Sequence, residues 1–230
     1  MSIVKELKEQ LAIGCRAMGT EEWVKSYGHV SARIPGSDLF LIPRNTKMAN
    51  VKEEDLWTYN FKSEKVEGGS GLGASEIPIH SCIYRARPDV MSVCHVHPHY
   101  AVLLTLVGET IKPITMSAIR YPKGVPVFEG LGLIVTDELG NALAKALGDN
   151  RAIILRAHGA VTVGQDIPDC VTTMVGLEDM ARYQVEAMMI GKPRLFTAEE
   201  IEKLRVTFKL AEKIHPLQKR GWDNLLSKIN

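Results

Sequence analysis

Residues 90–100, Val-Met-Ser-Val-Cys-His-Val-His-Pro-His-Tyr, are the stretch from which the fold and the candidate site are worked out. Strand-like residues lead into His95 and His97, and side chains two apart on a strand lie on the same face. Pro98 lacks a backbone N–H and favours an extended conformation at His97, so the strand should end there. The pattern therefore predicts two imidazoles at the rim of a sheet, where a metal ion can meet a substrate.

The length and composition indicate one soluble globular domain spanning residues 1–230. The chain has 45% hydrophobic and 24% charged residues, and no Gly/Ser/Pro-rich linker divides it. A net charge of +1 gives no basic excess for nucleic acid or for an acidic membrane surface. The expected partner is therefore a small-molecule substrate.

The apolar runs and the cysteines indicate a cytoplasmic protein. The longest apolar runs, such as residues 101–107, are far shorter than the ~20 residues of a membrane span, and the N-terminus lacks a signal-peptide core. The cysteines have neither CxxC nor framework spacing, which favours reduced, buried thiols; they are Cys15, Cys82, Cys94 and Cys170.

The first part of the chain alternates one helix with short strands. Apolar residues at helical spacing predict a helix over residues 3–18. The turn at 35–38 predicts a hairpin between strands at 28–33 and 39–42, and a further strand is expected at 56–61. The glycine-rich residues 67–73 predict a mobile loop, and they lack the GK[ST] ending of a phosphate loop.

The second part of the chain is richer in helices. Ser75 is the expected N-cap of a helix from Glu76 to about Arg87, with Pro78 in its first turn. The other expected elements are an extended piece at 125–128, a helix at 137–147 capped by Thr136, strands at 152–156 and up to 164, and helices at 168–190, 197–213 and 216–229. On the helix at 168–190, a stripe of Met174, Leu177, Met180, Ala181 and Met188 is interpreted as core.

A third histidine completes a candidate metal site. His158 also follows a buried strand and precedes a glycine, so three imidazoles are available, which is the ligand number that leaves a catalytic metal an open position. From spacing alone, an incidental surface pair remains the alternative for His95 and His97. His80 and His99 are interpreted as structural or supporting histidines and not as ligands.

Two further groups could bind a ligand or serve catalysis, but each also has an ordinary structural explanation when taken alone. Glu76 at a helix N-terminus can be a partner of the helix dipole. Arg44 and Asn45 follow a strand directly and form a candidate anion-binding pair, for which a solvated surface arginine is the alternative.

Four segments together resemble the class II aldolase/adducin family. Gly28-His29-Val30-Ser31 is similar to its Gly-Asn-hydrophobic-Ser strand, and Ser75-Glu76 to its Ser-Glu at a helix start. His95-Val96-His97 resembles its HxH, and Arg156-Ala157-His158-Gly159 its downstream histidine-glycine. The resemblance covers about residues 5–190.

The resemblance implies the fold, the metal and the assembly. The expected fold is α/β, a three-layer α/β/α sandwich on a central, largely antiparallel sheet. His95, His97 and His158 are expected to hold one divalent ion per subunit, Zn2+ or Mn2+, with Fe2+ or Co2+ as further options. Glu76 is implied as acid/base or fourth ligand. A homotetramer with active sites at subunit interfaces is also implied.

Departures from the family's phosphosugar aldolases indicate the substrate. Those aldolases bind phosphate with small neutral donors, at the places occupied here by His29, Arg44-Asn45 and Ala74-Ser75. Bulk and positive charge suit a planar carboxylate held bidentately better than a sugar phosphate. The chain thus resembles the family's decarboxylase branch, which acts on hydroxylated aromatic dicarboxylates. The substrate-binding residues implied in this way are His29, Ser31, Arg44, Asn45 and Ser75.

Three alternatives remain at this point. The first is a class II aldolase that acts on a phosphorylated or related sugar. The second is an iron-dependent oxygenase on the same scaffold, because three histidines also hold iron. The third is an adducin-type interaction protein, against which the presence of all three histidines argues.

Overall fold

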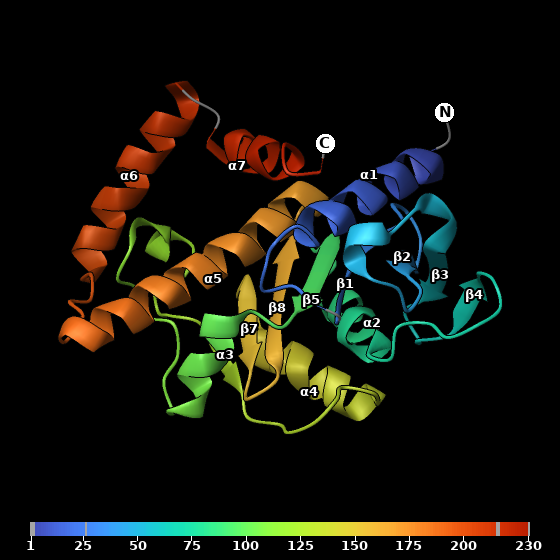
Figure 1. The fold of residues 1–230 in the computed structure, drawn as a ribbon, viewed down its shortest axis with the longest axis horizontal. Helices are drawn as coiled ribbons and strands as arrows, with labels where there is room; N and C mark the ends of the chain where they lie inside the picture. The colour runs from blue at the N-terminus through green and yellow to red at the C-terminus, as the bar shows by residue number, and fades with distance from the viewer. Residues whose placement is uncertain (1–2, 26, 215–216, 230) are drawn as a thin grey trace.

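The computed structural model describes residues 3–25, 27–214 and 217–229, and within them the strands form one sheet. Its order is β4-β3-β2-β1-β5-β8-β7-β6, and the described pairs are antiparallel except for β6 with β7. Figure 1 shows the sheet crossed by long helices. The strands are β1 Gly28–Arg33, β2 Leu39–Pro43, β3 Leu56–Asn60, β4 Lys65–Glu67, β5 Ser92–Val96, β6 Val127–Phe128, β7 Ala152–Leu155 and β8 Gly159–Gly164.

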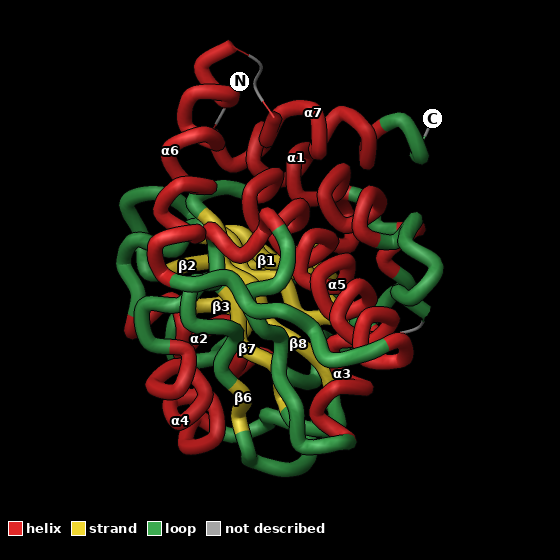
Figure 2. The backbone as a smooth tube through the Cα atoms, turned by 90° about the vertical axis from the view of Figure 1, so that its left-hand side faces the viewer, coloured by secondary structure: helices red, strands yellow, loops and turns green. Residues whose placement is uncertain are grey.

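Helices cover both faces of this sheet. Figure 2 shows the sheet between α1 and α5 on one side and α2 and α4 on the other. The expected three-layer α/β/α sandwich with a largely antiparallel sheet is therefore confirmed. The helices are α1 Ile3–Met18, α2 Ile77–Ala86, α3 His99–Leu106, α4 Asp137–Leu147, α5 Ile167–Ile190, α6 Ala198–Ile214 and α7 Leu217–Leu226, with 3-10 turns at Met48–Asn50, Glu53–Asp55 and Met116–Ile119.

Alternation along the strands separates two hydrophobic cores. In β7, Ala152 and Ile154 pack in the core beneath α1 and α5, whereas Ile153 and Leu155 pack in the core beneath α2 and α4. Successive side chains on a strand point to opposite faces, so a strand buried on both faces reads as a continuous apolar run. This explains why residues 152–155 contain no polar side chain.

The register of three neighbouring strands brings the candidate site together. His29 of β1 lies opposite His95 of β5, and Val96 of β5 lies opposite Ala160 of β8. Because the pairs are antiparallel, the start of β1, the end of β5 and the start of β8 lie side by side at the same end of the sheet, where these central strands begin or finish. Gly28 opens β1 with φ +130°, and a Cβ there would lie 2.6 Å from Val96 Cγ1, so this start requires glycine.

Several boundaries differ from the sequence expectation. The N-cap of α2 is Glu76 and not Ser75, and β4 pairs with β3 just before the glycine-rich loop, where no strand was expected. Met188 is 41% exposed because it lies near the free end of α5, beyond the sheet, so its assignment to the core was wrong. The start expected for the last helix, residue 216, lies outside the described residues. The four cysteines are free and buried, as expected.

The elements otherwise follow the sequence pattern closely. Thr136 caps α4 by accepting from the backbone N–H of Leu139, as predicted. No helix among the described residues combines the length and the apolar character needed to span a bilayer.

A buried carboxylate holds the helix that follows the histidine strand. Both oxygens of Glu178 on α5 accept backbone N–H groups from the first turn of α3, Tyr100 at 2.8 Å and Ala101 at 3.0 Å. Burial raises the pKa of Glu178, and these N–H groups oppose that shift. A carboxylate at a helix N-terminus satisfies donors that the helix itself leaves unpaired. Glu178 therefore anchors α3 and the Pro98 turn before it.

We predict that Glu178→Ala lowers the free energy of unfolding by about 1–3 kcal/mol, because two buried donors lose a charged acceptor. Urea denaturation followed by circular dichroism measures the change. Glu186→Ala is the matched control, since Glu186 is exposed on the same helix and forms a surface ion pair with Arg182. The control should shift stability by less than about 0.5 kcal/mol. Equal losses in both variants would contradict the anchoring role.

Candidate metal centre

Four predicted residues converge at this end of the sheet. Glu76, His95, His97 and His158 each offer one ligand atom, and these atoms all lie within 4.8 Å of one another. Glu76 comes from the start of α2, His95 and His97 from β5 and its end, and His158 from the turn between β7 and β8. Three neutral imidazoles and a carboxylate form a ligand set suited to a divalent transition metal.

Backbone contacts orient His95 towards the centre of this group. Nδ1 of His95 lies 3.0 Å from the carbonyl oxygen of Ala160, an acceptor only, so Nδ1 carries the proton and donates it. The lone pair of Nε2 then faces the cluster, as metal-binding histidines require. Gly159 makes room for the rings, because a Cβ there would lie 2.7 Å from His97 Cδ2 and 3.0 Å from His95 Cε1.

A tight turn places His158 opposite these rings. Ala157 has φ 55°, a left-handed conformation that is uncommon for a residue with a side chain. The ring centroid of His158 lies 5.1 Å from the ring centroid of His95 and 4.9 Å from that of His97. The strained residue therefore sits directly before the candidate ligand, where surrounding structure must stabilise it.

The loop before α4 orients the Glu76 carboxylate. Oε1 of Glu76 accepts the backbone N–H of Ile134 at 2.8 Å, and Oε2 lies 3.4 Å from His95 Nε2 and 3.5 Å from His158 Nε2. The last two distances exceed a good N–H···O hydrogen bond. Ligand atoms bound to one tetrahedral zinc at about 2.0–2.1 Å would lie roughly 3.4 Å apart. The spacing therefore fits ligands around an ion better than direct hydrogen bonds.

The electrostatics of the group also suit a cation. Burial raises the pKa of the Glu76 carboxyl, but the neighbouring His158 and His95 outweigh it and hold the pKa well below its usual range. Burial, followed by the charges of His95 and His158, lowers the pKa of His97 to about 4. Nε2 of His95 and both ring nitrogens of His158 are buried without a hydrogen-bond partner among the described residues. A neutral imidazole has one acceptor nitrogen, and a bound metal ion would satisfy such an unpaired acceptor on each of these rings.

A second histidine pair lies beneath the first. Nδ1 of His29 is 2.7 Å from Nε2 of His80, and Nδ1 of His80 is 2.7 Å from the Ser31 hydroxyl. The Ser31 hydroxyl is in turn 2.7 Å from that of Tyr84. Burial lowers the pKa of His29 to about 3 and that of His80 well below its usual range, and burial raises the pKa of Tyr84. The two rings are therefore neutral and the phenol is protonated.

The predicted substrate residues fall into two groups. His29 is 8% exposed, and its ring lies 5.3 Å from that of His95, so it borders the cluster. Ser31 differs from expectation, because it is fully buried under His29 and contacts no open space. Arg44, Asn45 and Ser75 are exposed at the same end of the sheet.

Arg44 is tied to a carboxylate. Its Nε donates to Asp55 at 2.7 Å, and no other guanidinium nitrogen of Arg44 has a hydrogen bond among the described residues. The terminal nitrogens therefore remain available to a ligand. The main-chain N–H of the neighbouring Asn45 donates to the carbonyl of Leu72, which brings the glycine-rich loop over this pair.

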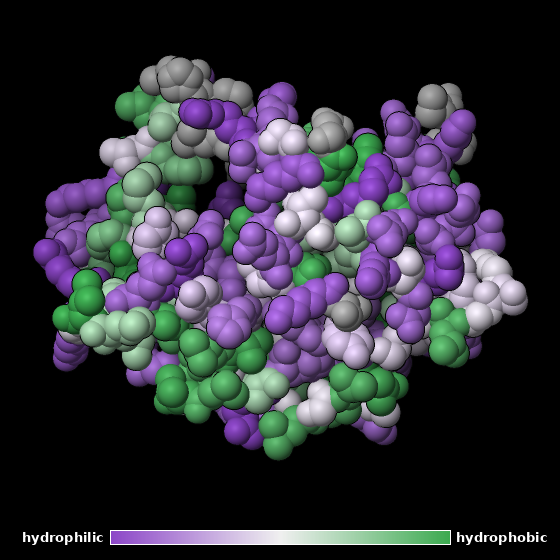
Figure 3. Space-filling view, in the orientation of Figure 1, coloured by the Kyte–Doolittle hydropathy of each residue, from purple (hydrophilic) through white to green (hydrophobic). Residues whose placement is uncertain are grey.

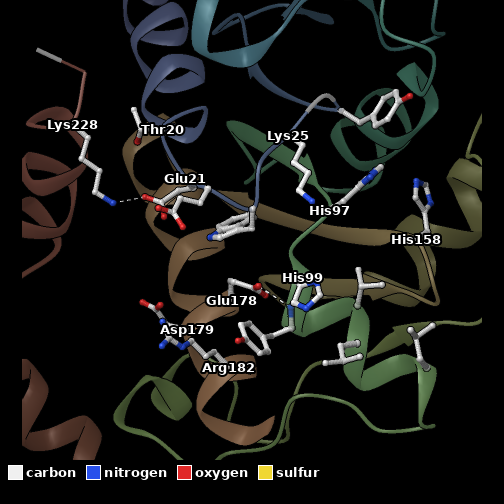
Figure 4. A pocket seen from close by; sticks show the side chains of 17 residues that line it. Thr20, Glu21, Lys25, His97, His99, His158, Glu178, Asp179, Arg182 and Lys228 are labelled. Carbon is white, nitrogen blue, oxygen red and sulfur yellow. Dashed lines mark hydrogen bonds and ion pairs between the residues drawn. The ribbon is translucent and has the colours of Figure 1, made fainter. Parts of the chain in front are cut away.

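An open cleft of about 1270 Å³ leads from the cluster along the face of α3 and α5. Figure 4 shows His97 and His158 at one end of the cleft and the Lys228–Glu21 ion pair at the other. Two of the candidate metal ligands therefore face a space large enough for a small aromatic or sugar substrate. His99 lines the cleft but is not in the ligand group, as expected.

Sequence reasoning missed the groups that orient the ligands. The Ala160 carbonyl and the Ile134 N–H are backbone atoms that no side-chain pattern reveals. Tyr84 had a signal, because it follows His80 by four residues and such residues share a helix face.

Comparison with known proteins agrees with this geometry. Residues 9–185 match the model of the class II aldolase and adducin N-terminal domain. The chain is 29% identical over 178 residues to a 3,4-dihydroxyphthalate decarboxylase of Rhodococcus jostii, covering 71% of this chain and 72% of the relative. It is 26% identical over 211 residues to a 5-deoxy-D-ribulose 1-phosphate aldolase of Bacillus thuringiensis, covering 90% and 97%.

A solved structure has the same fold. The aldolase II superfamily protein of Pseudomonas syringae superimposes with a TM-score of 0.82 at 26% identity, covering 97% of this chain and 92% of that one. The family match spans most of the chain, and its relatives include both decarboxylases and aldolases, which cleave carbon–carbon bonds. The chain belongs to the class II aldolase and adducin N-terminal domain family.

Proposed function

We propose that this protein is a metal-dependent carbon–carbon lyase that decarboxylates a hydroxylated aromatic dicarboxylate. The observation that carries the proposal is the convergence of Glu76, His95, His97 and His158, of which His97 and His158 line the cleft. The similarity to 3,4-dihydroxyphthalate decarboxylases supports the reaction type.

The three histidines would hold the metal and Glu76 would handle protons. A bound divalent ion supplies a Lewis acid that stabilises negative charge on a chelated substrate oxygen as the C–C bond breaks. Oε2 of Glu76 lies beside the candidate ligands, so Glu76 is placed to take the proton of the substrate hydroxyl and to return a proton to the ring carbon that loses carbon dioxide. The Ile134 N–H holds Oε1 and leaves Oε2 facing the reacting groups. Glu76 as a fourth ligand is the alternative role.

The groups around the cluster favour an aromatic acid over a sugar phosphate. His29 borders the metal ligands, and Arg44 is exposed at the same end of the sheet with two terminal nitrogens available. A planar guanidinium suits a carboxylate bound through both oxygens. The class II aldolase stays the second candidate, because relatives with that activity match as much of the chain.

We further propose that the active form is a homotetramer with sites at subunit interfaces. Large apolar side chains are exposed at the end of α3 and in the loop before α4, namely Leu106, Val107, Leu131, Leu133 and Val135. Figure 3 shows apolar atoms gathered along the lower margin of the molecule, in the region of α3 in Figure 1. Apolar groups gathered in this way are typical of a protein–protein interface.

Each single change of His95, His97 or His158 to alanine should lower the bound divalent metal, because one of three neutral ligands is lost. Elemental analysis measures the metal and identifies it, so it also tests for the iron of an oxygenase. Activity should fall at least ~10-fold, judged from what changes of residues supporting metal ligands cost.

Gly159→Ala tests the same site without removing a ligand. A methyl group there would displace the rings of His95 and His97, so the metal content should fall. Gly176→Ala on α5 is the matched control, because its added Cβ would meet no described atom within 4 Å outside the adjacent backbone of its own helix, and it should retain the metal. Full metal content in all three histidine variants would disprove the site.

Light scattering should find a tetramer in the purified protein. Leu131→Glu should dissociate it, because a charge would enter the proposed apolar contact. Leu210→Glu is the control, since this leucine is exposed on α6, a different element from the loop before α4 that contains Leu131. The Leu210→Glu variant should remain a tetramer. A wild-type monomer at micromolar concentration with full turnover would refute the shared site.

A substrate panel separates decarboxylase from aldolase. Hydroxyphthalates, hydroxypyridine dicarboxylates, fuculose phosphate and ribulose phosphate are assayed for released carbon dioxide and aldehyde. We expect carbon dioxide from an ortho-hydroxylated aromatic dicarboxylate only. Arg44→Ala should then lower kcat/KM by a factor that corresponds to about 1.5–3 kcal/mol of lost transition-state stabilisation. Arg44→Lys should restore part of this loss.

Arg205→Ala is the control for that variant, because Arg205 also forms a surface ion pair, with Glu202 on α6. It should leave kcat/KM unchanged. Aldehyde from a phosphosugar, with no carbon dioxide from any aromatic acid, would establish the aldolase instead.

A further inference from the structure

A continuous chain of hydrogen bonds runs from the α2 side of the core to the edge of the metal cluster. Its members are Tyr84, Ser31, His80 and His29, joined by three contacts of 2.7 Å each. Tyr84 is 1% exposed and Ser31 and His80 are fully buried, whereas His29 keeps 8% exposure beside His95. Only the His29 end of the chain therefore reaches the candidate site.

The direction of this chain follows from counting protons. The Tyr84 hydroxyl has one proton to donate, and the Ser31 oxygen is the one side-chain acceptor that it contacts among the described residues. A buried hydroxyl without an acceptor loses the free energy of its bonds to water, so this proton points to Ser31. The Ser31 proton must then point to its other neighbour, Nδ1 of His80.

The same rule continues through the two rings. His80 is neutral and accepts at Nδ1, so its proton is on Nε2 and points to Nδ1 of His29. His29 accepts at Nδ1, so its own proton is on Nε2. That nitrogen has no hydrogen bond among the described residues, and its ring borders the cluster. The opposite direction would leave the buried Tyr84 proton without an acceptor among the described residues.

We infer that His80 is a positioning residue that holds His29 as its Nε2–H tautomer, so that the site offers a neutral hydrogen-bond donor to an anionic substrate oxygen beside the metal. The inference rests on the proposed function for the substrate, but not for the tautomer. A neutral donor binds a carboxylate or phenolate oxygen without adding a second full charge next to a divalent ion. In this tautomer, His29 cannot take a proton from the substrate through Nε2.

A neutron crystal structure of the wild-type protein tests the tautomer directly, because it locates exchangeable hydrogens that X-ray maps do not show. We expect deuterium on Nε2 of both His29 and His80 and none on Nδ1 of His29. Deuterium on Nδ1 of His29 would overturn the inference. This outcome is independent of activity: carbon dioxide release could fail in the substrate panel while the tautomer stands, and the reverse.

Two substitutions of His80 test its role in binding. The amide of His80→Gln can donate to His29 and accept from Ser31, in the same direction as the imidazole, whereas His80→Met can do neither. The probe is phthalate, a ring with two adjacent carboxylates, titrated calorimetrically into the metal-loaded enzyme. We expect His80→Gln to bind within about threefold of wild type, and His80→Met to bind roughly tenfold weaker or worse, as for a lost hydrogen bond to a charged group.

Two comparisons separate positioning from folding. Tyr121→Phe removes a phenol hydroxyl that is buried in the other core and has no hydrogen-bond partner among the described residues, so it should leave phthalate affinity unchanged. In a His29→Gln background, His80→Met should not lower phthalate affinity further, because the imidazole that His80 positions is absent. The role of His80 would be overturned if His80→Gln and His80→Met lowered phthalate affinity equally. It would also be overturned if His80→Met lowered phthalate affinity as much in the His29→Gln background as in the wild type.

Discussion

The register of β1, β5 and β8 is the constraint on which the site depends. A shift by one residue would exchange the two faces of a strand. His29 and His95 would then enter the core under α1 and α5, and Val30 and Cys94, which now pack there, would enter the candidate site. Because both faces are buried, such a shift would place imidazoles among apolar side chains without partners. The hydrophobic cores therefore fix the positions of the candidate ligands.

Local patterns in the sequence predicted the parts of the site that local physics determines. Alternation and Pro98 predicted the end of the histidine strand, and the elements on both sides of it were found within a few residues. Long-range contacts decided the rest. The side chain of Glu76, the N-cap of α2, is oriented by the backbone N–H of Ile134, 58 residues away in the chain. Ser31 looked like a site residue in the motif, yet α2 covers it.

The same comparison explains the other differences. Met188 follows the helical stripe of α5, but the helix extends beyond the sheet, so periodicity continues where burial does not. Strand β4 forms because β3 offers it an edge, a property of the sheet and not of residues 65–67. The pairing of Arg44 with Asp55 joins residues 11 apart across a loop, which no strand or helix pattern predicts. Each of these features depends on what a segment packs against.

The polar chain beneath the site is placed by the alternation of β1. Val30 and Ala32 pack in the apolar core on the α1 and α5 side, so the residues that alternate with them, His29 and Ser31, must face α2. Isolated polar groups there would be unfavourable. His80 and Tyr84, one turn apart on the same face of α2, provide hydrogen-bond partners for them. Each buried donor then has an acceptor, except at the His29 end. An otherwise apolar core can accommodate this row because its one open hydrogen bond is directed to the place where we propose that the substrate binds.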